Sequence, residues 1–298
     1  MGTDYTILFP KWGRLIGIIS FLIIFLASLW LIWSGNIGIR YSGDHEGTIP
    51  IWNKWVPAVV GIILVRLIPF RLESDNPLYD LNQRILTIQA SVLVMGGVLF
   101  TTSLLIVSGQ GWESEFWYLG LKLVLLLIMP WLMFNVYQSN QTNRPRPTKP
   151  HSFTRSWLAP LIVSSVWFYL SFYSIFAMPS VPTGLADPSM LIIPLLSGFL
   201  INSVLEEIFY RVWLQTRLER LLGTWPAILL TSILWASWHI AIHGTGQWDI
   251  DAATVLANHG VTGLFFGYLW ARYRNVWVLI IIHGLINAPP HYILEIFF

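Results

Sequence analysis

The sequence contains no cysteine among its 298 residues. Disulfide bonds, thiolate catalysis and cysteine-ligated metal sites are therefore excluded. Charged side chains are also scarce, at 11% of the chain, whereas an average soluble domain carries roughly 25%. The formal net charge is only +2, and the basic residues fall in short separate segments rather than in one patch. We therefore expect no nucleic-acid partner.

Long apolar runs dominate what is present, with 55% hydrophobic residues and a mean hydropathy of +0.62. Continuous runs of this length favour membrane-spanning helices, because barrel strands would show alternating apolar and polar residues. We predict an all-α polytopic integral membrane protein with eight to nine transmembrane helices. The expected spans are 15–33, 55–70, 85–107, 117–137, 157–177, 190–212, 226–243, 254–271 and 276–298.

The number of spans is given as eight to nine because two of the runs are irregular. The run 55–70 is short and contains Arg66 and Pro69, and the run 276–298 is interrupted by Pro289 and Pro290. The first run, 15–33, is too long for the apolar part of a signal peptide and lacks a small-residue cleavage site, so we expect it to be an uncleaved span.

The positive charges of the connecting segments alternate along the chain. Fourteen Lys and Arg residues lie in one set of connections, and the other set holds Arg40, Lys54 and Lys122. Because positively charged loops favour the cytoplasmic side, the N-terminus is expected in the cytoplasm. The expected location is the cell (plasma) membrane.

A polar segment rich in proline and arginine, residues 138–156, divides the chain. It is expected to be a cytoplasmic connector between a four-span N-terminal region, 1–137, and a C-terminal membrane region, 157–298. We find no internal repeat, which weighs against a proton-coupled transporter built from inverted repeats.

Three polar motifs lie inside the later spans. They are Glu206-Glu207-x-x-x-Arg211, then Trp235-Ala-Ser-Trp-His239, then His283-Gly-Leu-Ile-Asn287. Ionisable groups at membrane depth are costly, and they persist mainly where they face a protein interior or a watery cavity. These motifs are the candidate functional residues.

Helical geometry separates the two adjacent glutamates. Glu207 and Arg211 are four residues apart, share a helix face and are expected to form a supporting ion pair. Glu206 points about 100° away. Counted from the cytoplasmic connections, Glu206, His239 and His283 lie about 21, 20 and 12 Å along their helices. We therefore expect them to meet in one layer.

A carboxylate, two imidazoles and an amide in one buried layer suit water-dependent acyl chemistry. A carboxylate beside a histidine can take a proton from water and return it to a leaving amine. A second histidine and an asparagine can donate hydrogen bonds to the oxygen of a tetrahedral intermediate. The simpler interpretation of Glu206 is a buried acid bonded to Asn202 or Ser203. Three other histidines lie outside the three motifs and are expected to be structural: His243, His259 and His291.

The order of the motifs, with Gly263-Leu-Phe-Phe-Gly-Tyr-Leu269 before the third, resembles the CAAX-protease and bacteriocin-processing family (CPBP, or Abi) of intramembrane endopeptidases. That family includes the type II CAAX prenyl endopeptidases, and the resemblance covers a core of about 190–290. It implies that Glu206 is the catalytic glutamate and that His239 helps it to activate water. It also implies that His283 and Asn287 stabilise the oxyanion. In the supporting positions stand Glu207, Arg211 and Trp235, the last where the family usually has phenylalanine.

The resemblance leaves the cofactor and the substrate open. Glu206, His239 and His283 could form a zinc-binding set, but the chain has no H-E-x-x-H motif, and we expect no metal cofactor. The expected partners are the lipid bilayer and a membrane-associated peptide or protein substrate, with or without a lipid modification. A membrane scaffold or immunity protein that binds a peptide or a partner in the same cavity is the alternative to an enzyme.

Overall fold

The computed structural model describes residues 7–40, 47–68, 77–78, 81–107, 112–138, 154–179 and 187–297. Within these ranges the elements are helices, apart from one short antiparallel hairpin, β1 (Gly38–Arg40) and β2 (Thr48–Pro50). The predicted all-α fold class is confirmed.

The described elements before residue 139 are helices α1 to α5 and the hairpin. α1 (Pro10–Trp33) precedes the hairpin, and α2 (Trp52–Leu67) follows it. α3 (Gln83–Val107) is followed by α4 (Trp112–Lys122), which continues through the π-helical segment η1 (Leu123–Ile128) into α5 (Met129–Gln138).

The helices after residue 153 begin with η2 (Thr154–Leu158) and α6 (Ala159–Tyr173). One long helix of 34 residues, Ser189–Leu222, comes next. It contains the last part of η3 (Pro188–Leu191), and then α7 (Ile192–Gly198), η4 (Phe199–Val204), η5 (Glu207–Gln215) and α8 (Thr216–Leu222). The remaining elements are α9 (Thr224–Ser237), α10 (Ile240–His243), α11 (Trp248–Val255), η6 (Leu256–Gly260), α12 (Val261–Tyr273), α13 (Val276–Asn287) and α14 (Pro290–Phe297).

Six helical stretches of the described chain are long and apolar enough to cross a membrane. They are Pro10–Trp33, Gln83–Val107, Glu115–Tyr137, Ser156–Tyr173, Ser189–Leu222 and Thr224–His243. The expected run at 55–70 is helical up to Leu67, with residues 69 and 70 outside the described residues, and the expected run at 254–271 is helical. Neither is among these six, and Val276–Asn287 is a shorter apolar helix. The last expected run is divided between α13 and α14 at Pro289 and Pro290, because proline lacks the N–H that a continuing helix needs. The count of eight to nine spans stays a prediction.

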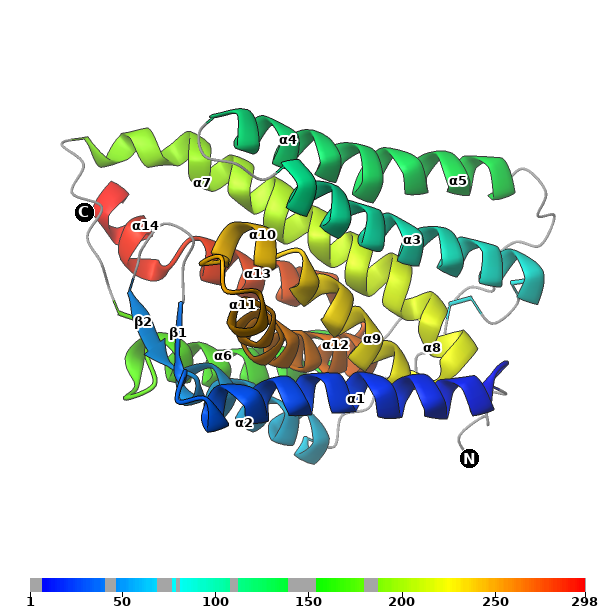
Figure 1. The fold of residues 1–298 in the computed structure, drawn as a ribbon, viewed down its shortest axis with the longest axis horizontal. Coiled ribbons are helices and arrows are strands. Elements are labelled where there is room, and N and C mark those ends of the chain that lie inside the picture. The colour runs from blue at the N-terminus through cyan, green and yellow to red at the C-terminus, as the bar shows by residue number, and fades with distance from the viewer. Residues whose placement is uncertain are drawn as a thin grey trace.

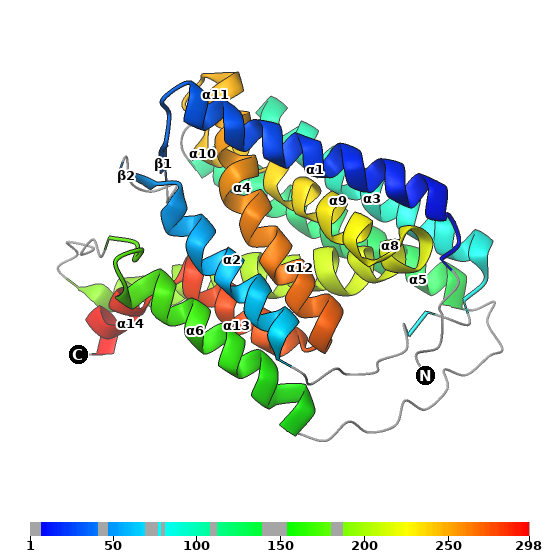
Figure 2. The same cartoon turned by 90° about the horizontal axis from the view of Figure 1, so that it is seen from below.

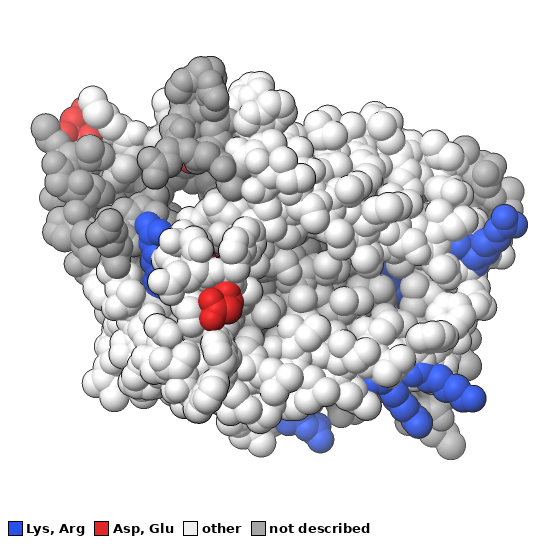
Figure 3. Space-filling view, in the orientation of Figure 1, with Lys and Arg blue, Asp and Glu red and all other residues white. Residues whose placement is uncertain are grey.

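The outer surface of α1 shows why the fold needs a bilayer. Ile18, Leu26 and Trp33 are 59%, 57% and 81% exposed. A contiguous apolar surface of this kind is rare on a soluble monomer, but it suits contact with lipid. The face drawn in Figure 3 is largely uncharged. The protein is therefore an integral membrane protein.

Helices from both sides of the expected connector share the same cores. α3 and η1 pack with the long helix and α9 around Leu93, Phe100, Phe209 and Trp235. α2 and α6 pack with α12 and α13 in a second core. Figures 1 and 2 show α1 and α2 lying along the side of the bundle that α9 and α12 form. Residues 139–153 of the connector lie outside the described residues.

Two glycines of the G-L-x-x-G-x-L segment allow α12 to approach α9 closely. A Cβ atom at Gly263 would lie 2.9 Å from Ser232 Cβ, and one at Gly267 would lie 2.9 Å from Ile228 Cγ2. Both distances are shorter than side-chain contacts allow. This close packing places the cavity-lining residues of η6 and α12 beside the second motif on α9.

Candidate active site

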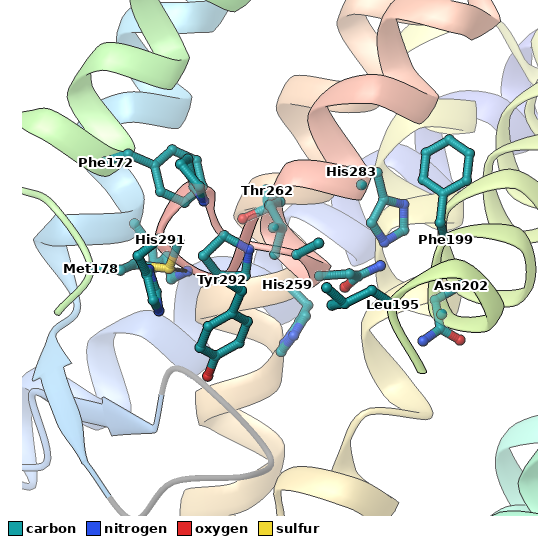
Figure 4. Close-up of a pocket in the computed structure, with 18 of the residues that line it drawn as sticks. Phe172, Met178, Leu195, Phe199, Asn202, His259, Thr262, His283, His291 and Tyr292 are labelled. Atoms are coloured by element: carbon teal, nitrogen blue, oxygen red, sulfur yellow. Dashed lines mark hydrogen bonds between the residues drawn. The ribbon is translucent and has the colours of Figure 1, made fainter. Parts of the chain in front are cut away.

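A cavity of about 520 Å³ lies among α9, η6, α12, α13 and the first half of the long helix. Residues of the second and third sequence motifs line its wall, and the first motif is hydrogen-bonded to them from behind it. Figure 4 shows His283, Phe199 and Asn202 at one side of the cavity and Met178 and His291 at the other, with His259 between them. The wall residues that carry polar groups include Asn202, Trp235, His239, His259, His283 and Asn287.

Glu206 is buried at 1% exposure and is not among the residues that line the cavity. One carboxylate oxygen, Oε1, forms an ion pair with the ammonium of Lys122. The other oxygen, Oε2, accepts a hydrogen bond of 2.6 Å from the indole Nε1–H of Trp235. Trp235 and Asn202 form the part of the cavity wall next to Glu206. The carboxylate therefore lies directly behind the wall.

Lys122 does not lie in a connecting segment, and this prediction is wrong. The residue is fully buried, at the end of α4. The available signal was its position inside the apolar run 117–137, because a cation at membrane depth indicates an interior partner. The partner lies on a helix more than 80 residues away, and sequence spacing does not reveal such contacts.

Glu207 has the expected neighbour and one more. Its Oε2 lies 3.4 Å from Arg211 Nε, as the spacing of four residues predicts. Its Oε1 lies 2.8 Å from His283 Nδ1 on α13. Arg211 is fully buried and lies over the Trp235 ring, at 5.2 Å from the centroid. Glu207 thus orients a histidine that lines the cavity, in addition to supporting the helix.

His239 is held by the backbone of its own helix. Its Nδ1 lies 3.0 Å from the carbonyl oxygen of Trp235. Its ring stacks on Trp238 and on His259, each with a centroid distance of 3.7 Å. Within the described residues, no hydrogen bond joins Glu206 directly to His239; Trp235 links them, through its indole to one and its carbonyl to the other.

Asn287 and His259 also lie on the cavity wall. Asn287 Nδ2 donates to Ser203 Oγ at 3.0 Å, which ties α13 to the helix of the first motif. His259, expected to be structural, lies on η6 against His239 and lines the cavity. No motif contains His259, so only the tertiary contact reveals it.

Trp235 stands where the CPBP family that the motifs resemble usually has phenylalanine, and the larger side chain makes an additional contact. The aromatic wall is kept, and Trp235 lies at 5.3 Å from His239 and 5.5 Å from His283, measured between ring centroids. The indole N–H also supplies the bond to Glu206 that phenylalanine lacks. Trp235 is therefore a polar contact of the candidate glutamate as well as a packing residue.

The possible zinc set is not arranged for a metal ion. Glu206, the carboxylate of the set, has one oxygen paired with Lys122 and the other bonded to Trp235. Across the described part of the chain, no three His, Asp or Glu side chains are grouped to hold a metal. As arranged here, these residues do not fit zinc. The expected lack of a cofactor stays a prediction.

Comparison with known proteins agrees with the motifs. Residues 188–289 match the family model described as "Type II CAAX prenyl endopeptidase Rce1-like". This match confirms the resemblance to a CAAX protease-like family that the three motifs indicate. It covers roughly a third of the chain and includes every residue of the three motifs. No curated protein and no solved structure matches the chain.

Proposed function

We propose that this protein is an intramembrane endopeptidase that hydrolyses a peptide bond of a membrane-associated protein or peptide. One observation carries the proposal: residues of the second and third motifs line a single cavity within an apolar helical bundle, and the two glutamates of the first motif are hydrogen-bonded to them. A family of CAAX prenyl endopeptidases supports a protease-like hydrolase, and the cavity is large enough for a short extended peptide segment.

In the proposed reaction, a water molecule enters from the cavity and gives a proton to Glu206, with His239 holding the water. The water oxygen forms a bond to the peptide carbonyl carbon, and the carbonyl oxygen becomes an oxyanion. The proton then passes to the amide nitrogen, the carbon–nitrogen bond breaks, and the amine leaves. The proton path from the cavity to Glu206 runs past Asn202 and Trp235, the two wall residues beside it.

His283 and Asn287 are the proposed donors to the oxyanion. In this role His283 is an imidazolium, because both ring nitrogens then donate: Nδ1–H to Glu207 and Nε2–H to the oxyanion. Asn287 uses one amide hydrogen for Ser203 and retains the second. Donors that are already fixed in place stabilise a developing charge without reorganisation. The Arg211–Glu207 pair keeps this side of the site in register.

The proposal also includes the topology that the sequence predicts. Eight to nine spans with a cytoplasmic N-terminus in the cell membrane would place the cavity within the bilayer. Substrates would then reach it from the membrane, either as lipid-modified C-terminal peptides or as membrane-anchored precursors.

The test is proteolysis by the purified protein in liposomes. The probes are a fluorescence-quenched peptide with a farnesylated cysteine and a quenched transmembrane peptide without lipid. Cleavage by the wild type that is lost in Glu206→Ala and His239→Ala would support the proposal. Equal cleavage by wild type and both variants would reject the mechanism.

The alternative is a non-catalytic scaffold or immunity protein that binds a peptide or a partner in the same cavity. One observation favours it: Glu206 lies behind the wall and both of its oxygens are engaged. Comparative proteomics of cells with wild-type or Glu206→Ala protein separates the two functions. A cleavage product present only with the wild type indicates the enzyme, and identical products together with complementation by Glu206→Gln indicate the scaffold.

A further inference from the structure

Lys122 brings a positive charge into the site from the N-terminal region, 1–137, which lies outside the segment that matches the family model. Its side chain is 0% exposed. The ammonium forms an ion pair with Glu206 Oε1, donates to Asn202 Oδ1 at 2.8 Å and donates to the Tyr118 hydroxyl. Because an ammonium has three hydrogens, these contacts use its full donor capacity.

Aromatic rings cover the remaining sides of this ammonium. Its nitrogen lies 4.3 Å from the centroid of the Tyr118 ring and 4.5 Å from that of Trp238. Trp238 in turn stacks on His239. Lys122 thus touches Glu206 directly and is one ring away from His239, the two residues proposed to activate water.

Structural support alone is a weak explanation for this ion pair. A buried pair is often no more stabilising than apolar residues of the same volume, because both charges lose their hydration. The chain also provides apolar contacts for joining the same elements: Phe100, Leu126 and Phe209 belong to one core there. What an apolar residue could not supply is a countercharge that fixes one oxygen of Glu206.

The other charged residues near Glu206 have partners of their own. Arg211, a buried cation on the long helix itself, is directed at Glu207. Glu207 also bonds His283. Among the described residues, the cation that pairs with Glu206 is Lys122.

We propose that Lys122 is a positioning residue for Glu206: it holds Oε1 so that the carboxylate presents its remaining lone pairs towards Trp235, Asn202 and the cavity. The N-terminal region therefore supplies part of the active site. This inference rests on the proposed hydrolase function.

The experiment compares three variants of the full-length protein in liposomes with the two quenched peptides described above. Lys122→Met removes the charge and keeps an unbranched chain, and Lys122→Arg keeps the charge. Gln89→Leu is the matched control, because Gln89 also makes a buried contact from the N-terminal region to the long helix, through Arg217 at 2.9 Å. Arg217 is 11 residues beyond Glu206, about 16 Å along a helix.

We expect Lys122→Met to lower kcat at least about 100-fold, the effect of misplacing a catalytic group by about 1 Å. KM should stay within about threefold of the wild type, because Lys122 does not line the cavity. Lys122→Arg should recover part of kcat, and Gln89→Leu should keep kcat near the wild-type value. A Lys122→Met variant that resembles Gln89→Leu, or that changes only KM, overturns the proposal.

Thermal melts of Lys122→Met, Glu206→Gln and the double variant supply a readout that needs no substrate. A direct ion pair predicts that the double variant loses less melting temperature than the sum of the two single variants, because neither charge is left alone. Additive losses overturn the pairing itself. If the wild type cleaves neither peptide but the losses are non-additive, the proposed hydrolase function fails and the positioning role fails with it, leaving a structural ion pair.

Discussion

Glu206 and Glu219 lie on the same long helix, and each pairs with a buried or half-buried cation from a distant element. Glu206 meets Lys122 beside a cavity whose wall includes two motif histidines, His239 and His283, and the motif asparagine Asn287. Glu219 meets Arg274, and its second oxygen accepts a 2.8 Å hydrogen bond from Gln215.

The surroundings of the two pairs differ, although the pairs themselves are alike. Gln215 also donates to the carbonyl of Gly267 at 2.8 Å, so the Glu219 cluster closes on the backbone of α12. Arg274 caps α12 in a left-handed conformation, with φ of 49°. Neither Glu219 nor Gln215 lines the cavity. A buried carboxylate–cation pair is therefore no evidence of catalysis by itself; its position next to a polar cavity is what distinguishes Glu206.

The largest predicted effect compares Glu206→Gln with Glu219→Gln. Loss of the proposed catalytic base should lower kcat by roughly 10²- to 10⁴-fold, whereas Glu219→Gln should leave kcat within about threefold of the wild type, since Glu219 does not line the cavity. Peptide cleavage in liposomes measures both. A similar loss of activity in the two variants would show that the pairs do not differ in function.

The second prediction concerns stability at the other pair. Glu219→Ala should lower the free energy of unfolding by about 3 kcal/mol, because removing one partner leaves a cation largely buried without its countercharge. This value is at the lower end of the range for breaking a buried ion pair, because the side chain of Arg274 is 15% exposed. Denaturation in mixed micelles measures it, with Arg217→Lys as a control that retains its charge. A change below about 0.5 kcal/mol would place Glu219 with ordinary surface pairs.

The third prediction tests the indole contact. Trp235→Phe keeps the aromatic wall but removes the N–H that donates to Glu206. A hydrogen bond to a charged group contributes about 1.5–3 kcal/mol, so kcat should fall roughly tenfold or more. The control is Trp225→Phe, at an exposed tryptophan remote from the cavity wall. Unchanged kcat in Trp235→Phe would mean that Lys122 alone holds the carboxylate.

The smallest predicted effect affects the Glu219 cluster alone. In Gly267→Ala the added methyl group would lie 2.9 Å from Ile228 Cγ2 and 3.0 Å from Gln215 Oε1. Slight overpacking of this kind costs about 1 kcal/mol or somewhat more. The melting temperature should fall while kcat stays within about twofold. A fall in kcat beyond about twofold would show that the Glu219 cluster and the Glu206 site are coupled.

The sequence could predict the members of the motifs but not all of their partners. Glu207 with Arg211 was predictable, because residues four apart on one helix share a face. The bond from Glu207 to His283 and the contact of His239 with His259 depend on how separate helices pack. Depth counted along each helix indicates which residues share a layer, but it leaves open how each helix is rotated about its axis.

By itself the sequence determined the class of protein: with so few charges and so many long apolar runs, the backbone must satisfy its hydrogen bonds within helices in a bilayer. It also determined which side chains are costly at that depth and therefore worth explaining. Only the tertiary structure decided that Glu206 meets Lys122 and Trp235 and that the N-terminal region borders the site. The physical reason is that a charge buried in a low-dielectric interior takes its partner from whichever helix packs against it, irrespective of the distance between them along the chain.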